Sequence, residues 1–419
     1  MKKARDYWHL LGPGLTTGAA DDDPSGIATY SQTGAQYGFN MLWLAVFTFP
    51  LMAVVQEMCA RIGLVTGRGL AANIRLHYSK GMLYASALLL FAANTFNIGA
   101  DLGAMAKAAQ LFWPRLNFAG LVLLLAGLML LMQIFISYGK YAKYLKWLSL
   151  TLLAYIATAF AVHINWQQAL MAGLVPRLSF GRQEIFLLCG ILGTTISPYL
   201  FFWQTSQEVE EKILQGQTTI KQRQVADKPT INNMRFDVWF GMFFSNLVMF
   251  FIILTCGAVL FSHGLTDIQT AEQAAAALEP FAGRYAFSLF AVGIISVGIL
   301  AVPVLAGSAS YAISEAFGWK EGLYRKFRQA EAFYGIIILA MALGLLMNFL
   351  GLDAIKTLIY AAVLNGIIAP IVLIPVVQIS GNKKIMGQWR SGNLATVVGW
   401  ATILLMISAG AVAVAGLFF

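Results

Sequence analysis

Apolar runs recur along almost the whole chain, and each is long enough to cross a bilayer. A helix needs about 20 apolar residues to span the hydrocarbon core, where only a helix or a closed barrel satisfies its own backbone. The chain is 59% hydrophobic and 11% charged, which excludes an ordinary water-soluble globule. We therefore expect an all-α polytopic membrane protein with eleven transmembrane helices, forming a single transmembrane domain over residues 1–419.

Lysine and arginine residues gather in alternate connections between these runs. On one side they lie at the N-terminus and near residues 61–80, 140–146, 212–235, 320–328 and 383–390. Cytoplasmic loops carry such an excess, so we expect a cytoplasmic N-terminus and an external C-terminus in a bacterial-type inner (plasma) membrane. We also expect the first apolar segment to be retained. The net charge of +9 could suggest nucleic acid, but this distribution favours a lipid bilayer as the partner and no nucleic acid. The oligomeric state stays open.

The first apolar segment, residues 7–37, is too long for one crossing and contains Asp21-Asp22-Asp23-Pro24-Ser25-Gly26. An ionised Asp at membrane depth is costly unless it is paired, hydrated or holding an ion. Pro24 and Gly26 can interrupt the helix and free backbone groups beside the acids. A plainer interpretation makes Asp23 an N-cap with Pro24 at the first helical position. A cap inside a bilayer is itself a helix break, so both interpretations predict a discontinuous helix.

A second interruption lies in the sixth apolar segment, residues 184–211, where Pro198 follows a run of threonine and serine. A mid-span proline removes a backbone hydrogen bond, and neighbouring hydroxyls can satisfy the freed carbonyls. A kinked but continuous helix is the alternative for this segment taken alone. Breaks in the first and sixth segments occupy matching places in two five-helix halves. This pattern predicts inverted repeats over about residues 7–163 and 184–379, which meet at a midplane site, and an extra helix over about 394–418.

Two further polar residues lie inside apolar segments. Asp101 falls within residues 82–112, and an intramembrane acid is a functional candidate by default. A structural pair with Lys107 is the alternative, although residues six apart do not share a helix face. Asn365, within residues 358–379, could coordinate an ion or bond a neighbouring helix, and the latter is the more frequent role.

The two breaks offer carboxylates, hydroxyls and unwound carbonyls, and this all-oxygen set suits hard cations. An anion would need helix N-termini and cationic side chains, so the acids argue against an anion unless a cation accompanies it. The sequence has no phosphate-binding glycine-rich loop, which argues against ATP-driven pumping. It also has no nucleophile–base pair, so we expect neither an enzyme nor a cofactor.

Four stretches, residues 12–14, 23–29, 34–38 and 60–68, resemble the first two helices of the Nramp (natural resistance-associated macrophage protein) family of divalent-metal transporters. The similarity continues through Gly99-Ala100-Asp101-Leu102, the sixth-segment break and the segment around Asn365, and so covers most of the chain. The resemblance implies a LeuT-like fold of two inverted five-helix repeats, with the substrate held between broken helices 1 and 6.

The sequence departs from the resembled family at its ligand positions. Family members that bind manganese or iron typically have Asp-Pro-Gly-Asn in helix 1, whereas this chain keeps Asp23 but has Gly26 in place of the asparagine. In helix 6, Ser197 replaces the methionine ligand, and Tyr199 and Gln204 replace two histidines. Loss of a thioether removes the discrimination in favour of softer metals, so hard ions should compete better. Nramp-related magnesium transporters also lack this methionine.

The sequence also departs from the resembled family at the positions that relay protons. The helix 10 glutamine of the family appears as Ala362, and a helix 3 glutamate appears as Ala104, three residues after the retained Asp101. The two missing histidines are groups that titrate near neutral pH. Asp101 therefore remains the main candidate for proton coupling, and we expect that coupling to be weak or absent.

From these observations we predict a secondary-type transporter that imports a hard divalent cation by alternating access. Magnesium is the favoured substrate, and manganese stays open. The alternative is a transporter of a small anion such as bicarbonate, or of an uncharged solute, coupled to a cation such as sodium. The expected metal ligands are Asp23, Thr194 and Ser197, further substrate-contacting residues are Ser25, Gly26, Tyr199 and Asn365, and coupling or pathway residues are Asp22, Asp101 and Gln204.

Overall fold

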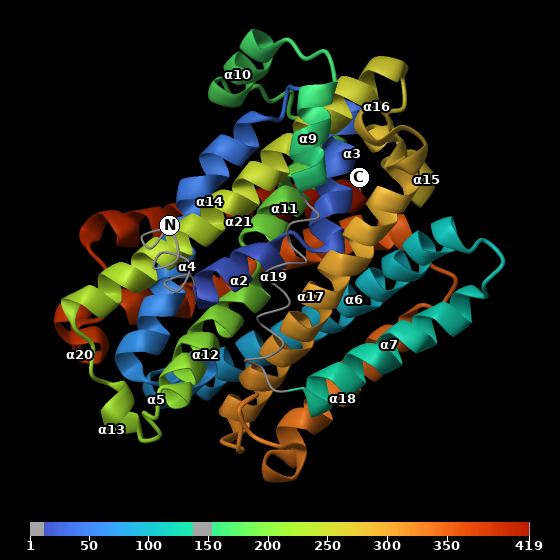
Figure 1. Ribbon diagram of the computed structural model, residues 1–419. Coiled ribbons are helices and arrows are strands. Elements are labelled where there is room, and N and C mark those ends of the chain that lie inside the picture. The colour runs from blue at the N-terminus through green and yellow to red at the C-terminus, as the bar shows by residue number, and fades with distance from the viewer. Residues whose placement is uncertain (1–11, 137–152, 419) are drawn as a thin grey trace, which may run out of the picture.

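The computed structural model describes residues 12–136 and 153–418, and this part of the chain is built from helices without a strand. Figure 1 shows the helices gathered into one bundle. Those of the first half are α2 (Pro13–Asp21), α3 (Pro24–Tyr37), α4 (Trp43–Thr66), α5 (Leu70–His77), α6 (Lys80–Phe112), α7 (Phe118–Phe135), α9 (Leu153–Ala161) and α10 (Trp166–Leu174). The second half contains α11 (Arg182–Thr195), α12 (Pro198–Leu214), α13 (Ile220–Arg223), α14 (Lys228–Val259), α15 (Ala271–Ala275), α16 (Glu279–Ala282), α17 (Ala286–Phe317), α18 (Glu331–Met347), α19 (Ala354–Gly381), α20 (Lys383–Met386) and α21 (Asn393–Phe418).

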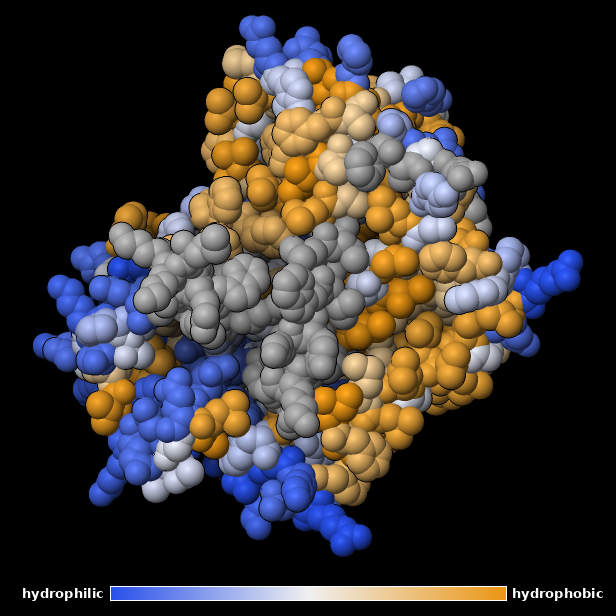
Figure 2. Space-filling view, viewed as in Figure 1, coloured by the Kyte–Doolittle hydropathy of each residue, from blue (hydrophilic) through white to orange (hydrophobic). Residues whose placement is uncertain are grey.

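Eight helices of the described part are long and apolar enough to cross a membrane, counting α11 and α12 together. The predicted all-α polytopic fold is confirmed. In Figure 2 apolar residues cover a broad belt of the visible face, and hydrophilic residues gather at its opposite ends. The count of eleven stays a prediction, because α18 has only 17 residues, α2 and α3 are short halves, and α9 starts at the edge of the described residues.

Both predicted interruptions are present. Helix α2 ends at Asp21, Asp23 has an extended backbone, and α3 begins at Pro24. Helix α11 ends at Thr195, and α12 begins at Pro198. A proline at the first helical position needs no N–H partner, which is why each second half starts there. The sixth segment is thus discontinuous, and the alternative of a kinked continuous helix is wrong.

Helices α2 and α3 both pack along α14 through glycines. A Cβ added to Gly18 would lie 2.3 Å from the Gly241 carbonyl oxygen, and one added to Gly34 would lie 2.4 Å from that of Ile253. Such close backbone approach is a feature of helix interfaces in membranes, where van der Waals contact supplies much of the association energy. The two halves of the broken helix are therefore seated against one continuous helix.

Asp237 of α14 fixes the start of α2. Its carboxylate accepts hydrogen bonds from the backbone N–H groups of Gly12, Gly14 and Leu15, at 2.8, 2.7 and 3.2 Å. The first N–H groups of a helix have no partner within the helix, and an anion at that end also interacts favourably with the helix dipole. Asp237 therefore caps α2 from a distant part of the sequence.

Basic connections meet at one end of the bundle, around a cavity of 230 Å³. Its lining includes Arg68 after α4, Arg223 on α13 and Arg325 after α17. These residues come from three of the connections that the charge pattern assigns to the cytoplasm. Their proximity agrees with the prediction that these connections lie on the same side of the membrane. The orientation of the termini stays a prediction. Lys140, Lys143 and Lys146, and the basic residues before Gly12, lie outside the described residues.

Two buried glutamates join elements beside this cavity. Glu315 of α17 accepts a hydrogen bond from the Ala72 N–H of α5 at 2.9 Å. Glu210 of α12 accepts one from the Tyr311 hydroxyl of α17 at 2.6 Å. In the connection after α17, burial raises the pKa of the Glu321 carboxyl, and nearby Arg75 opposes that rise. These contacts close the bundle between α5, α12 and α17.

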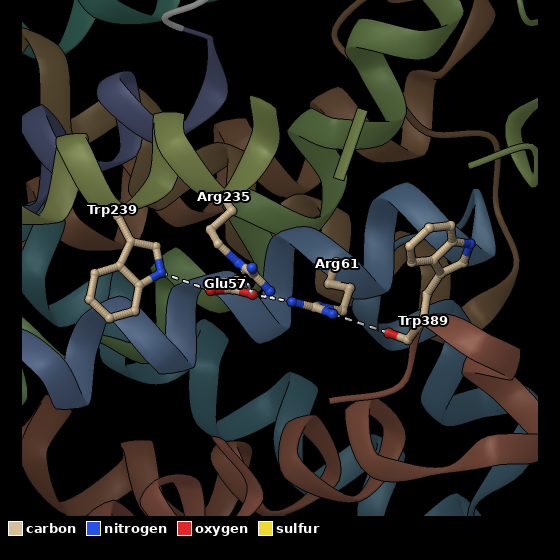
Figure 3. A network of polar contacts seen from close by, with 5 residues as sticks. All are labelled: Glu57, Arg61, Arg235, Trp239 and Trp389. Carbon is tan, nitrogen blue, oxygen red and sulfur yellow. Dashed lines mark hydrogen bonds and ion pairs between the residues drawn. The ribbon is translucent and has the colours of Figure 1, made fainter. Parts of the chain in front are cut away.

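Figure 3 shows a second network of polar contacts, centred on Glu57 of α4. Glu57 pairs with Arg61 one turn along the same helix and with Arg235 of α14, at 3.0 Å, and accepts a hydrogen bond from the Trp239 indole at 2.7 Å. Arg61 also donates to the Trp389 carbonyl oxygen at 3.4 Å. The network joins α4, α14 and the connection before α21. Sequence reasoning did not identify it.

Candidate cation site at the two helix breaks

Asp23 is held at the start of α3 by hydrogen bonds from three groups. Its Oδ1 accepts hydrogen bonds from the Ser25 hydroxyl and the Gly26 N–H, both at 2.7 Å. Its Oδ2 accepts one from Asn97 Nδ2 of α6 at 2.9 Å. The side chain is only 2% exposed. The N-cap interpretation is confirmed, and Ser25 and Gly26 lie beside Asp23 because they form the first turn that it caps.

Asp21 and Asp22 lie at the end of α2 and are fully buried. The Ser245 hydroxyl of α14 donates to Asp21 Oδ2 at 2.6 Å and lies 3.3 Å from Asp22 Oδ1. The other carboxylate oxygen of each residue has no hydrogen-bond partner among the residues that the structure describes. No described Lys, Arg or His forms an ion pair with any of the three acids Asp21–Asp23. The break therefore gathers three carboxyl groups in the interior of the protein, and no described basic side chain pairs with them.

The second break faces the first one. The Tyr199 hydroxyl of α12 donates to the Ala20 carbonyl oxygen of α2 at 2.9 Å. Thr194 of α11 lies 3.0 Å from the Tyr30 hydroxyl of α3. The Ser197 hydroxyl bonds the carbonyl oxygens of Gly193 and Thr194, at 2.7 and 2.6 Å. A hydroxyl that donates its proton keeps lone pairs on its oxygen, so Thr194 and Ser197 remain chemically able to face a cation.

Asp101 of α6 is fully buried, and neither of its carboxylate oxygens has a hydrogen-bond partner in the described part of the chain. It lies one helical turn after Asn97, whose Nδ2 contacts Asp23. Lys107 lies instead over the Phe118 ring, 5.2 Å from the ring centroid, and is exposed. The alternative of an Asp101–Lys107 pair is therefore wrong.

Two predicted residues are not joined to this group. Gln204 of α12 donates from Nε2 to Glu208 Oε1 at 2.9 Å, on the part of α12 that leads away from the break. Asn365 of α19 is buried, and no hydrogen bond in the described part of the chain joins its amide to either break. The parts that Gln204, Asn365 and Asp22 play in transport stay predictions.

Sequence reasoning missed three residues that contact this region, Tyr30, Asn97 and Ser245. Asn97 could have been found, because it lies four residues before Asp101 and so shares its helix face. Tyr30 and Ser245 carried no signal in the sequence.

Carboxylates alone do not surround a metal ion here. Within residues 12–136 and 153–418, no three His, Cys, Asp or Glu side chains are arranged to hold one. A cation beside Asp23 would take its remaining ligands from hydroxyl, amide, carbonyl or water oxygen. Such a mixed oxygen shell is typical of magnesium and calcium and unlike that of zinc.

The sequence profile described as natural resistance-associated macrophage protein-like (Nramp) matches residues 14–416. The divalent metal cation transporter MntH of Klebsiella pneumoniae subsp. pneumoniae is 26% identical over 414 residues, covering 95% of this chain and 92% of the relative. MntH of Yersinia enterocolitica is 25% identical over 412 residues, covering 96% and 93%.

Solved structures of similar fold include the manganese transporter of Eremococcus coleocola in complex with an aromatic bis-isothiourea substituted compound. It has a TM-score of 0.72 and 18% identity, with 96% of this chain and 85% of that chain covered. Inward-facing Mhp1 has a TM-score of 0.55 and 14% identity, with 96% and 90% covered. At these identities the likeness shows the fold alone, and the fold is LeuT-like.

Proposed function

The chain belongs to the natural resistance-associated macrophage protein-like family, and from that premise we propose that it is a membrane transporter of divalent metal cations. Its favoured substrate is a hard cation, magnesium first and manganese second, which it imports by alternating access. The observation that carries this proposal is Asp23, a buried carboxylate fixed at a helix break in the protein interior. Buried acids of this kind mark ion pathways in membrane proteins.

The composition of the site supports a hard cation. The two breaks present oxygen atoms from Asp23, Thr194 and Ser197 and no sulfur. Magnesium dehydrates reluctantly and usually keeps several waters, being held by one or two carboxylates. We propose that Asp23 contacts the ion, and that Thr194 and Ser197 face its hydration shell with their hydroxyl lone pairs.

Transport would require little proton movement. Tyr199 and Gln204 replace the two helix 6 histidines of the resembled family. Histidine titrates near neutral pH and can relay protons, whereas tyrosine and glutamine do not titrate there. Entry of a divalent cation is instead favoured by the membrane potential, which contributes about 2.3 kcal/mol per charge for each 100 mV. We propose that the inverted repeats, about residues 7–163 and 184–379, supply the two halves that move relative to one another.

The proposal is tested by ion uptake into proteoliposomes. Vesicles with an inside-negative potassium diffusion potential are expected to accumulate Mg²⁺ and Mn²⁺ faster than protein-free vesicles, and dissipating the potential should slow both. A pH gradient should change the rates little. If neither ion enters while a sodium gradient drives bicarbonate or an uncharged solute inward, the proposal fails and the sodium-coupled alternative replaces it.

A further inference from the structure

Helix α6 carries two polar side chains to Asp23. Asn97 and Asp101 are four residues apart, so their side chains lie on the same face with Cβ atoms roughly 6 Å apart. Asn97 is in contact with the acid, since its Nδ2 lies 2.9 Å from Asp23 Oδ2. Asp101 lies one helical turn further along α6 and is also fully buried. The face of α6 that meets the first break is therefore defined by these two residues.

Within the described residues, three oxygen atoms of these two side chains have no hydrogen-bond partner. They are Asn97 Oδ1 and both carboxylate oxygens of Asp101. Both side chains have 0% exposure, so bulk water does not solvate them. A buried polar group without a partner costs about 1–3 kcal/mol, and an ionised one costs more. Three such oxygens beside another acid are therefore available to a positively charged ligand.

The two carboxylates set the charge of that ligand. No described Lys, Arg or His forms an ion pair with Asp23 or Asp101, and Lys107, the nearest cation along α6, lies over Phe118. Asp21 and Asp22 lie instead at the Ser245 hydroxyl of α14. The remaining pair, Asp23 and Asp101, matches the charge of a divalent cation, whereas a monovalent one would leave a net buried charge on that pair. Carboxylate and amide oxygens are the ligands of magnesium, calcium and manganese.

The α6 oxygens differ from the hydroxyls of the second break. The Ser197 hydroxyl already bonds carbonyl oxygens of its own helix, and Thr194 lies within bonding distance of the Ile191 carbonyl oxygen and the Tyr30 hydroxyl. Among the described residues, Asn97 Oδ1 and the two Asp101 carboxylate oxygens have no such contacts. The first break also lacks a side-chain amide oxygen, because Gly26 stands where the resembled family has asparagine.

We propose that Asn97 and Asp101 complete the divalent-cation site together with Asp23, so that α6 supplies an amide oxygen and the second carboxylate. This inference rests on the proposed function and assigns its ligands. Asp101 is then a cation ligand, and its role as a proton group is not required. Ligands from α3 and α6 would make cation binding draw these two helices together.

The test measures Mn²⁺ binding to purified protein by electron paramagnetic resonance, in which the six-line signal of free Mn²⁺ falls on binding, with MgCl₂ as the competitor. The Asn97→Leu variant keeps the side-chain size but has no oxygen, and Asp101→Asn keeps the shape but loses the charge. Each is expected to raise the dissociation constant by at least roughly 10- to 100-fold, the range typical for loss of a residue that only orients a metal ligand. Asn97→Asp keeps an oxygen at this position and should retain binding.

The control is Gln133→Leu, which removes a buried amide from α7. Gln133 Nε2 donates to the Pro303 carbonyl oxygen of α17 at 3.0 Å, and α7 contributes no residue to the proposed site. This variant should bind Mn²⁺ as the parent does even if its melting temperature falls. Because neither Asp101 oxygen has a hydrogen-bond partner among the described residues, Asp101→Asn should fold like the parent and keeps the test decisive if Asn97→Leu does not fold.

The outcomes separate the two claims. If the parent binds Mn²⁺, Mg²⁺ competes, and both α6 variants lose affinity, the inference is supported. If the parent binds but Asp101→Asn binds equally well, the α6 ligands are wrong while the proposed function stands. If the parent binds no Mn²⁺ and calorimetric titration with MgCl₂ gives no saturable heat, the proposed function is wrong, and the inference fails with it.

Discussion

An Asp23→Asn variant is expected to take up divalent cations at least about 100-fold more slowly than the parent. This effect is larger than that of removing a residue that only orients a metal ligand. Asn keeps an oxygen that can accept the Gly26 N–H, so the start of α3 should persist. What disappears is the buried negative charge, and with it the attraction for an ion that must shed water. The measurement is Mg²⁺ and Mn²⁺ uptake into proteoliposomes.

Asp353→Asn is the matched control. Asp353 is also an N-cap whose carboxylate accepts a backbone N–H three residues on, from Lys356 at 2.9 Å, but it is exposed at the start of α19. The same chemical change there should leave uptake unchanged. Equal uptake by the parent and Asp23→Asn would remove Asp23 from the transport site.

An Asp237→Ala variant is expected to lower the free energy of unfolding by about 3 kcal/mol or more, since a hydrogen bond to a charged acceptor contributes about 1.5–3 kcal/mol. Three backbone N–H groups at the start of α2 would lose their acceptor. Helix α2 ends at Asp21, directly before the cation site. We therefore expect slower uptake together with a lower melting temperature in detergent.

Asp227→Ala provides the comparison for this variant. Asp227 caps α14 by accepting the Thr230 N–H at 2.9 Å, and it is exposed. Losing an exposed cap of this kind costs little, because water can accept the freed backbone N–H. A melting temperature for Asp237→Ala no lower than that for Asp227→Ala would show that α2 does not depend on the carboxylate. Asp237→Asn keeps one acceptor oxygen, so its melting temperature should fall between those of Asp237→Ala and Asp227→Ala.

The helix breaks were predictable because their cause is local. Pro24 and Pro198 cannot donate to the preceding turn, and an acid or hydroxyl directly before each proline suits an N-cap. Apolar runs of bilayer length likewise predicted the long helices, such as α14 and α17. The short helices α5, α10 and α13 were not predicted, because helices of this length depend on the surface against which they pack.

The candidate site was only partly predictable. Asp23 was identified from its own motif, and Tyr199 and Thr194 from the second break, since each belongs to a local pattern. Asn97 reaches Asp23 across 74 positions of sequence, and no local pattern encodes the packing of α6 against α3 that brings them together. Ser245 is further away still in the chain.

The central claim is that this protein binds a hard divalent cation through Asp23, and calorimetric titration of the purified parent with MgCl₂ tests it most directly. The account predicts a saturable heat that MnCl₂ competes with and that disappears in Asp23→Asn but not in Asp353→Asn. Absence of a saturable heat for both ions in the folded parent, or an unchanged titration of Asp23→Asn, would contradict it.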